Sequence, residues 1–302
     1  MPDEGNNLHI VDLFDAGRSV AELPSISINR LAPPGGAFHR IAWSPIIKRF
    51  LFAAYDAIFL ISPDGDTQQL NLQVPGHLKQ YEGMDTYAIS VDGQYVAYYL
   101  NTRDFGDREE DPHGRLYQDI AFQRTEGSTP KSVARGMRPT AIRWSPNNDR
   151  LAFSSSNRVN VVDLAGRTLW NIQLGKDTAP SGVIPGYIMD LQWQPSGQSL
   201  ALISGDQIYL VNADGTDLRR IGFRGTDNVI TSVAWSPDGS QLAMRMVISN
   251  SCHFAMREDT FQECHSKSSL FVSDLDGGHL QRIPGTEFEG PPHPYTNLFW
   301  VY

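Results

Sequence analysis

The sequence predicts an all-β protein, a six-bladed β-propeller with four-stranded antiparallel blades. Five of the six tryptophans share one position of a recurring phrase, in which an apolar residue lies two positions before Trp and, in most copies, Ser-Pro and a Gly/Asn/Asp turn follow it. In the copies that are not cut short, the phrase is followed by further short apolar runs separated by turn residues, which is typical of short strands. A sixth copy has Ile89 where the others have Trp. The repeated tryptophans are Trp43, Trp144, Trp193, Trp235 and Trp300.

The copy at residues 188–221 shows how one blade is built. Its first turn, Gln-Pro-Ser-Gly at 194–197, has a proline that fixes φ and a glycine that tolerates positive φ. Its last turn, Ala-Asp-Gly-Thr, is equally short. Tight turns of this kind join antiparallel neighbours. The predicted strands are residues 189–193, 199–203, 207–212 and 217–221.

The same pattern runs along the chain, so we predict that residues 1–302 form one propeller domain. Residues 296–302 match the first strand of a blade, and residues 6–23 match a third and a fourth strand. Joining them gives a closing blade shared by the two termini, which removes exposed sheet edges. No segment matches the second strand, so we expect a three-stranded closing blade or a longer native protein. The predicted blades are residues 39–70, 84–133, 139–172, 188–221, 230–283, and 296–302 with 6–23.

Residues 235–243 (Trp-Ser-Pro-Asp-Gly-Ser-Gln-Leu-Ala) and 211–221 resemble the WD-like repeat of TolB-type β-propellers. The resemblance covers nearly the whole chain and implies the fold. The family includes periplasmic interaction proteins, the propeller halves of serine peptidases and sugar-acid lyases. The motif consists of core and turn residues, and we expect the tryptophans to pack between sheets. The chain lacks a recognisable α/β domain before the propeller, so no binding residue is carried over from TolB.

Composition limits the partners. The formal net charge is −9, with 34 acidic and 25 Lys and Arg residues, which disfavours nucleic acid and anionic membranes. No apolar run approaches the roughly 18 residues of a membrane helix. The N-terminus, Met-Pro-Asp-Glu-Gly, does not resemble a signal peptide.

The long connections are expected to share one face. In an up-and-down blade, the turns between strands 1 and 2 and between strands 3 and 4 emerge at one end. The other end carries the 2–3 loops and the links between blades. The long segments all belong to this second set, and exposed aromatic residues in them favour protein recognition. The segments are 101–115, 250–267, 24–38, 73–85, 175–187 and 284–296. Their candidate binding residues are Tyr81, Phe105, Tyr187, Phe254, Phe261, Phe288 and Tyr295.

The insertion at residues 103–113 contains five carboxylates. Carboxylates at this density can bind Ca²⁺, but the spacing does not match an EF-hand loop. Arg103 and Arg108 can neutralise the charges instead, which leaves a solvated acidic loop as the alternative. The candidate metal ligands are Asp104, Asp107, Glu109 and Asp111.

The only cysteines, Cys252 and Cys264, lie in the second insertion. An antiparallel excursion brings its two ends together, so we expect a disulfide that closes it. A zinc site with His253 and His265 and a pair of free thiols are the alternatives, although the spacing matches no standard zinc signature. A disulfide would indicate an oxidising compartment, periplasmic or extracellular, whereas reduced cysteines would indicate the cytoplasm.

No catalytic motif is present: the chain contains no Gly-x-Ser-x-Gly, His-Glu-x-x-His, Walker or Gly-x-Gly-x-x-Gly sequence. We therefore expect a non-catalytic scaffold that binds a protein or peptide, with no cofactor unless the acidic loop binds Ca²⁺. One alternative is a carbohydrate-active enzyme, a lyase or hydrolase, with a metal and histidine site at the central channel. Another is the propeller domain of a larger protein.

Overall fold

The structure is a computed structural model, and the residues that it describes form β-strands, turns and short connections only. Within these residues there is no helix long and apolar enough to span a bilayer. The described residues are 7–9, 25–27, 41–44, 46–54, 57–62, 66–70, 87–104, 115–175, 187–204, 206–222, 229–252 and 264–290.

Five antiparallel sheets follow one another along the chain, and each begins with four strands joined in sequence order. The fifth sheet carries an additional short strand on β21. The first two sheets consist of β3 (Ile41–Ser44), β4 (Arg49–Ala54), β5 (Ala57–Ile61) and β6 (Thr67–Leu70), then β7 (Tyr87–Ile89), β8 (Tyr95–Asp104), β9 (Arg115–Arg124) and β10 (Lys131–Arg135). The third and fourth consist of β11 (Ala141–Trp144), β12 (Arg150–Ser155), β13 (Arg158–Asp163) and β14 (Thr168–Gln173), then β15 (Asp190–Trp193), β16 (Ser199–Ser204), β17 (Gln207–Asn212) and β18 (Arg219–Ile221). The fifth consists of β19 (Ile230–Trp235), β20 (Gln241–Cys252), β21 (Cys264–Asp274), β22 (Gln281–Arg282) and β23 (Phe288–Gly290).

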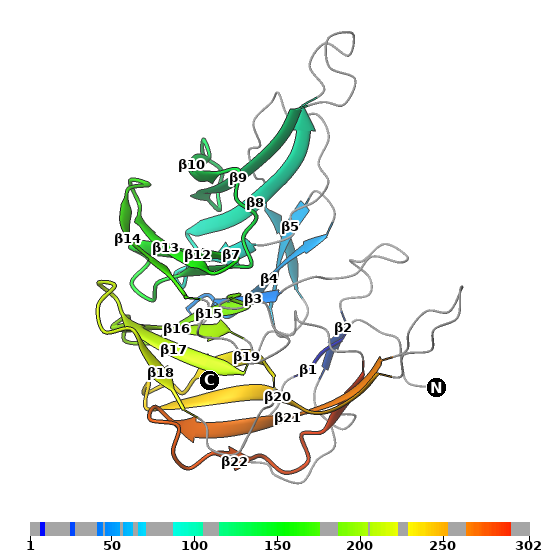
Figure 1. The fold of residues 1–302 in the computed structure, drawn as a ribbon. Coiled ribbons are helices and arrows are strands. Elements are labelled where there is room, and N and C mark those ends of the chain that lie inside the picture. The colour runs from blue at the N-terminus through cyan, green and yellow to red at the C-terminus, as the bar shows by residue number, and fades with distance from the viewer. Residues whose placement is uncertain are drawn as a thin grey trace, which may run out of the picture.

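These sheets are the blades of a propeller. The first strand of each blade contacts the first strand of the next, in the order β3, β7, β11, β15, β19. The blades therefore fan around their first strands, which form the inner wall of the ring, and Figure 1 shows this succession from cyan to orange. The predicted all-β propeller of four-stranded antiparallel blades is confirmed.

The described residues show five blades, whereas the sequence predicted six. A separate two-stranded sheet pairs β1 (Asn7–His9) with β2 (Ser25–Ser27). The sequence placed both N-terminal strands of the closing blade within residues 6–23 and treated residues 24–38 as a link, so β2 lies in the predicted link. The predicted first strand of that blade, residues 296–302, lies outside the described residues. The sixth blade therefore stays a prediction.

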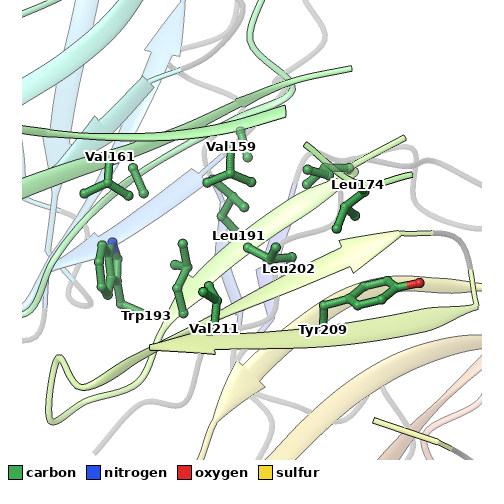
Figure 2. Close-up of a cluster of buried hydrophobic side chains, with 12 residues drawn as sticks. Val159, Val161, Leu174, Leu191, Trp193, Leu202, Tyr209 and Val211 are labelled. Carbon is green, nitrogen blue, oxygen red and sulfur yellow. The ribbon is translucent and has the colours of Figure 1, made fainter. Parts of the chain in front are cut away.

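The core consists of layers between neighbouring blades. Four clusters of buried apolar residues occupy the four interfaces between the five consecutive blades. Because side chains alternate along a strand, neighbours serve different interfaces. Tyr98 packs toward the first blade and Tyr99 toward the third. Figure 2 shows the layer between blades three and four, where Val159 and Val161 lie over Leu202 and Val211.

The repeated tryptophans connect each blade to the preceding one. Trp144, Trp193 and Trp235 are buried, and each lies in the apolar cluster shared with the preceding blade. Each indole Nε1–H also donates a hydrogen bond to a backbone carbonyl of that blade's first strand. The acceptors are the oxygens of Ala88, Arg143 and Gln192, at 3.3, 3.3 and 3.0 Å respectively. The predicted packing role is confirmed, and the structure adds a repeated hydrogen bond between blades.

The second blade departs from this pattern. Ile89 occupies the tryptophan position, is buried, and packs in the cluster between blades one and two. Its side chain has no N–H to donate. A hydrogen bond from Ser44 Oγ to the carbonyl of Val91, at 2.6 Å, joins these two blades at the neighbouring position.

Replacing Trp235 with Phe should separate the two contributions of the indole. Trp235→Phe keeps an aromatic ring but removes the donor to Gln192, so we expect the free energy of unfolding to fall by about 1–2 kcal/mol. Trp235→Ala also removes the packing and should cost about 3–5 kcal/mol. Denaturant unfolding measures both. Equal losses for the two variants would show that the hydrogen bond, not the packing, dominates.

Candidate binding face

The two ends of the blades differ in how their connections are built. The 1–2 and 3–4 turns emerge at one end, which we call the tight-turn face. The 2–3 connections and the links between blades emerge at the other end, the loop-rich face. In Figure 1 the tight hairpins β13–β14 and β17–β18 lie on the left, whereas the long pairs β8–β9 and β20–β21 extend upward and to the right.

The 1–2 turn of the fifth blade shows why its sequence is constrained. Gly239 has a φ of +70°, and its N–H donates to the carbonyl of Ser236 at 2.9 Å. Asn148 holds the equivalent place in the third blade with a φ of +59°, and asparagine tolerates this region better than most residues. Ser236 Oγ donates to Asp238 Oδ1 at 2.6 Å and accepts from the N–H of Gln241 at 2.9 Å.

This turn lowers the pKa of its own carboxylate. The hydrogen bond from the Ser236 hydroxyl lowers the pKa of Asp238 from 3.8 to about 2, assisted by hydrogen bonds from the backbone and hydroxyl of Ser240. All of these donors favour the ionised carboxylate. The negative charge of Asp238 is therefore stabilised by hydrogen-bond donors of its own turn.

Side chains on the tight-turn face also connect neighbouring blades. Gln194 Nε2 donates to the carbonyl of Gly239 at 3.0 Å, and Arg150 donates to the carbonyl of Ala213 at 2.7 Å. Lys131 Nζ donates to the carbonyl of Leu164 at 3.0 Å. Donors and turn carbonyls on this face are thus engaged in holding the ring together.

Two blades extend far beyond their neighbours at the loop-rich face. In the second blade, β8 and β9 stay paired out to Asp104 opposite Arg115. In the fifth blade, β20 and β21 stay paired out to Cys252 opposite Cys264. We call these the β8–β9 arm and the β20–β21 arm. The sequence treated residues 101–115 and 250–267 as loops, but both begin and end as ladder-paired strands, because a hairpin can lengthen without apolar alternation when only backbone groups pair.

The β20–β21 arm carries a further strand. β23 pairs with β21 through Ser266, Lys267 and Ser268, opposite Gly290, Glu289 and Phe288 respectively. This strand lies in the segment 284–296, which the sequence assigned to a link between blades. On the other edge of the arm, β19 pairs with β20 only as far as Met246, and the backbone N–H of Val247 then donates to Val229.

In the third and fourth blades the 2–3 connections are short. Ser156 and Asn157 join β12 to β13, and the N–H of Ile188 donates to the carbonyl of Ser156 at 2.7 Å. In the fourth blade, Asp206 Oδ1 is buried and has no hydrogen-bond partner among the residues that the structure describes. A buried carboxylate oxygen without a donor is costly, which makes this position on the loop-rich face a candidate contact for a ligand donor.

An ion pair joins the inner strands of blades three and four. Arg143 Nη2 lies 2.5 Å from Asp190 Oδ1, and the two side chains are 15% and 8% exposed. Asp190 Oδ1 also accepts from the N–H of Leu191 at 2.8 Å. Sequence reasoning missed this pair because its members are 47 residues apart. The available signal was an arginine and an aspartate in strands that are otherwise mostly apolar.

Of the candidate binding aromatics, the structure describes two. Tyr187 is half-buried and directly precedes Ile188 in the link before the fourth blade. Phe288 begins β23. Tyr81, Phe105, Phe254, Phe261 and Tyr295 lie outside the described residues.

Among the candidate metal ligands, only Asp104 is described. It ends β8 directly opposite Arg115 in the ladder. Asp107, Glu109 and Asp111 lie outside the described residues. The described part of the chain holds no group of three or more His, Cys, Asp or Glu side chains arranged to bind a metal.

The histidines that the structure describes do not meet at the inner strands. His279 lies in the 3–4 connection of the fifth blade, on the tight-turn face, and is 89% exposed. Its Nδ1 lies 2.6 Å from Asp274 Oδ2, and this contact raises the pKa of His279 and lowers that of Asp274. His9 lies in β1 and His265 in β21.

Comparison with known proteins supports the fold. The sequence model of the family "WD domain, G-beta repeat" matches residues 217–244, which run from the end of the fourth blade into β20. A structure assigned as TolB from Agrobacterium tumefaciens is similar, with a TM-score of 0.52 and 17% identity over 84% of this chain and 89% of that one. The common element is the propeller. No curated protein sequence matches the chain.

Two further solved structures are similar at comparable levels. Hydrazine synthase of Kuenenia stuttgartiensis gives a TM-score of 0.51 and 15% identity, covering 82% of this chain and 66% of that one. The β-propeller domain of Myceliophteria thermophila Cps50 (Swd1) gives 0.50 and 14%, covering 84% and 74%. At these identities the likeness concerns the fold alone.

The Asp238 carboxylate should titrate at a pH of about 2, measurable by NMR of its side-chain carbon. Its folded pKa lies below the ordinary value of 3.8, so its contribution to stability is complete above 3.8 and is lost as the pH falls toward about 2. Ser236→Ala removes the largest cause of the shift and should move the pKa back toward 3.8. An unchanged pKa in that variant would contradict the assignment.

The Arg143–Asp190 pair should show strong coupling. Arg143→Met leaves a buried carboxylate without its cation, and we expect a loss of about 3–5 kcal/mol in the free energy of unfolding. Adding Asp190→Asn should recover part of this loss, because the unpaired charge is removed. A double-mutant cycle by denaturant unfolding measures the coupling. Additive losses would mean that the pair contributes no interaction energy.

Proposed function

We propose that this protein is a non-catalytic propeller that binds a protein or peptide through its loop-rich face. The observation that carries the proposal is the asymmetry between the two ends of the blades. The tight turns use their polar groups within and between blades, whereas two blades extend paired arms at the opposite end. A rigid scaffold with its variable segments on one face is a common design for recognition.

The arms also suggest how a peptide would bind. On the side of β20 opposite β21, no strand of the described chain pairs beyond Val247. Exposed strand edges accept an extended peptide as an additional strand, with backbone hydrogen bonds supplying affinity. β23 is an example within the chain, because it adds to β21 in this way. Propellers of the TolB and WD40 types commonly bind proteins, which supports the same class of function.

The face assignment can be tested by replacing the β20–β21 arm. Ser249 and Lys267 pair in the ladder, so a short turn can replace residues 250–266 without breaking the blade. We expect this variant to lose capture of its partner from an extract of the source cells, measured by quantitative mass spectrometry. The matched control is Leu218→Ser, which changes an exposed apolar residue near the tight-turn face. Capture lost in the control but kept in the arm variant would reverse the assignment.

Photo-crosslinking gives an independent measurement. A photoreactive amino acid at Arg158, the first residue of β13 after the 2–3 connection of the third blade, should crosslink to the partner. The same group at Leu164, in the 3–4 turn of that blade, should not. Both positions are exposed and lie in one blade, so differences in folding do not explain a difference in crosslinking.

The finer architecture belongs to the same proposal. We propose that β1 and β2 belong to a sixth, closing blade completed by residues 296–302, since β1 lies in residues 6–23, which continue the repeat together with residues 296–302, and β2 pairs with β1. We also propose a periplasmic or extracellular location, supported by the two cysteines and by the resemblance to TolB-type propellers.

The enzyme and multidomain hypotheses stay predictions. Metal analysis of the purified protein tests the former, and the length of the native gene tests the latter.

A further inference from the structure

We propose that Cys252 and Cys264 form a cross-strand disulfide in the β20–β21 arm. The two residues are the last ladder pair of the arm, directly opposite each other in the antiparallel register. The sequence alone located both cysteines in one insertion. The register places them at the same level of two adjacent strands, and this inference stands independently of the proposed function.

Antiparallel geometry brings such a pair within bonding range. Residues directly opposite each other have Cα atoms roughly 4.5–5.5 Å apart and extend their side chains to the same face of the sheet. Disulfides span Cα separations of roughly 4.4–6.8 Å. The backbone spacing of a ladder pair therefore satisfies the requirement without a change in strand pairing.

The same register disfavours a zinc site. His265 follows Cys264 directly and pairs with Ser251, not with Cys252. Successive residues of a strand extend to opposite faces, so His265 and the two cysteines belong to opposite faces of the arm. A tetrahedral zinc site needs its ligands to converge on one point. The cysteine pair is therefore left as a dithiol that can oxidise.

Oxidation proceeds by thiol–disulfide exchange with a small disulfide such as oxidised glutathione. One cysteine thiolate attacks the oxidant's sulfur–sulfur bond, releases one glutathione thiolate and forms a mixed disulfide. The second cysteine thiolate then attacks the protein sulfur and releases the second glutathione thiolate. The two protein thiols lose two electrons and two protons, and the oxidant becomes two molecules of reduced glutathione.

The test uses the full chain, reduced and then equilibrated with oxidised and reduced glutathione. After alkylation, mass spectrometry should show an unalkylated protein lighter by two hydrogen atoms than the reduced form. A non-reducing digest should contain a peptide pair joined through Cys252 and Cys264. Full alkylation of both thiols after equilibration with excess oxidised glutathione would overturn the proposal. So would stoichiometric zinc that survives dialysis and is lost in Cys264→Ser.

A register-shifted variant provides the matched control. Cys264→Ser with Ser266→Cys keeps two cysteines but moves one to the position opposite Asn250. Cys252 then lies diagonal to its new candidate partner, at roughly 7–8 Å, beyond the usual reach of a disulfide. We expect the yield of the intramolecular disulfide to fall by about tenfold or more, because the shifted pair lies beyond the Cα separation that a disulfide usually spans. Equal yields from the native and shifted pairs would show that register does not determine the bond.

Discussion

The contact between neighbouring blades is the constraint on which the rest of the structure depends. The described apolar clusters all lie between blades, and the second, third and fourth sheets each bury both faces against different neighbours. Leu202 serves the interface with the third blade and Ala201 the interface with the fifth, although they are adjacent in sequence. In the third, fourth and fifth blades the tryptophan of the inner strand combines a large apolar surface with a donor for the preceding strand's carbonyl. Stability is therefore close to a sum of nearest-neighbour terms, as in other repeat proteins.

This constraint acts unequally on the two faces. On the tight-turn face, residues such as Gln194 and Arg150 donate to carbonyls of the next blade, so turn length and turn conformation must stay fixed. At the opposite end, a hairpin grows by adding cross-strand pairs that need no other blade. The added pairs, such as Asp104 with Arg115, change the local surface without disturbing the ring. Changes in connection length should therefore affect stability little at the loop-rich face and strongly at the tight-turn face.

Local sequence patterns predicted the strands and turns of the blades well, but they did not predict the paired arms or the ion pair between two blades. In the fourth blade, three of the four predicted strands match β15, β16 and β17 within one residue, and β18 begins two residues later than predicted. The Gly239 turn and the buried Trp235 also follow from residue type and position. The paired arms were missed because their polar residues lack the alternation that identifies a half-buried strand. Arg143 and Asp190 were missed because the packing of two neighbouring blades, which local spacing does not reveal, brings them together.

The isoleucine at position 89 has a consequence for how the ring opens. The blade interfaces with Trp144, Trp193 and Trp235 each combine packing with an indole hydrogen bond. The interface beside Ile89 combines the packing of its apolar cluster with the hydrogen bond of the Ser44 hydroxyl. In a structure whose units are coupled only to their neighbours, the weakest coupling decides where a partial opening starts. Amide protons of β7 should then exchange with solvent earlier than their counterparts in β15. Among the four interfaces between the described blades, the one beside Ile89 is therefore the expected line of separation.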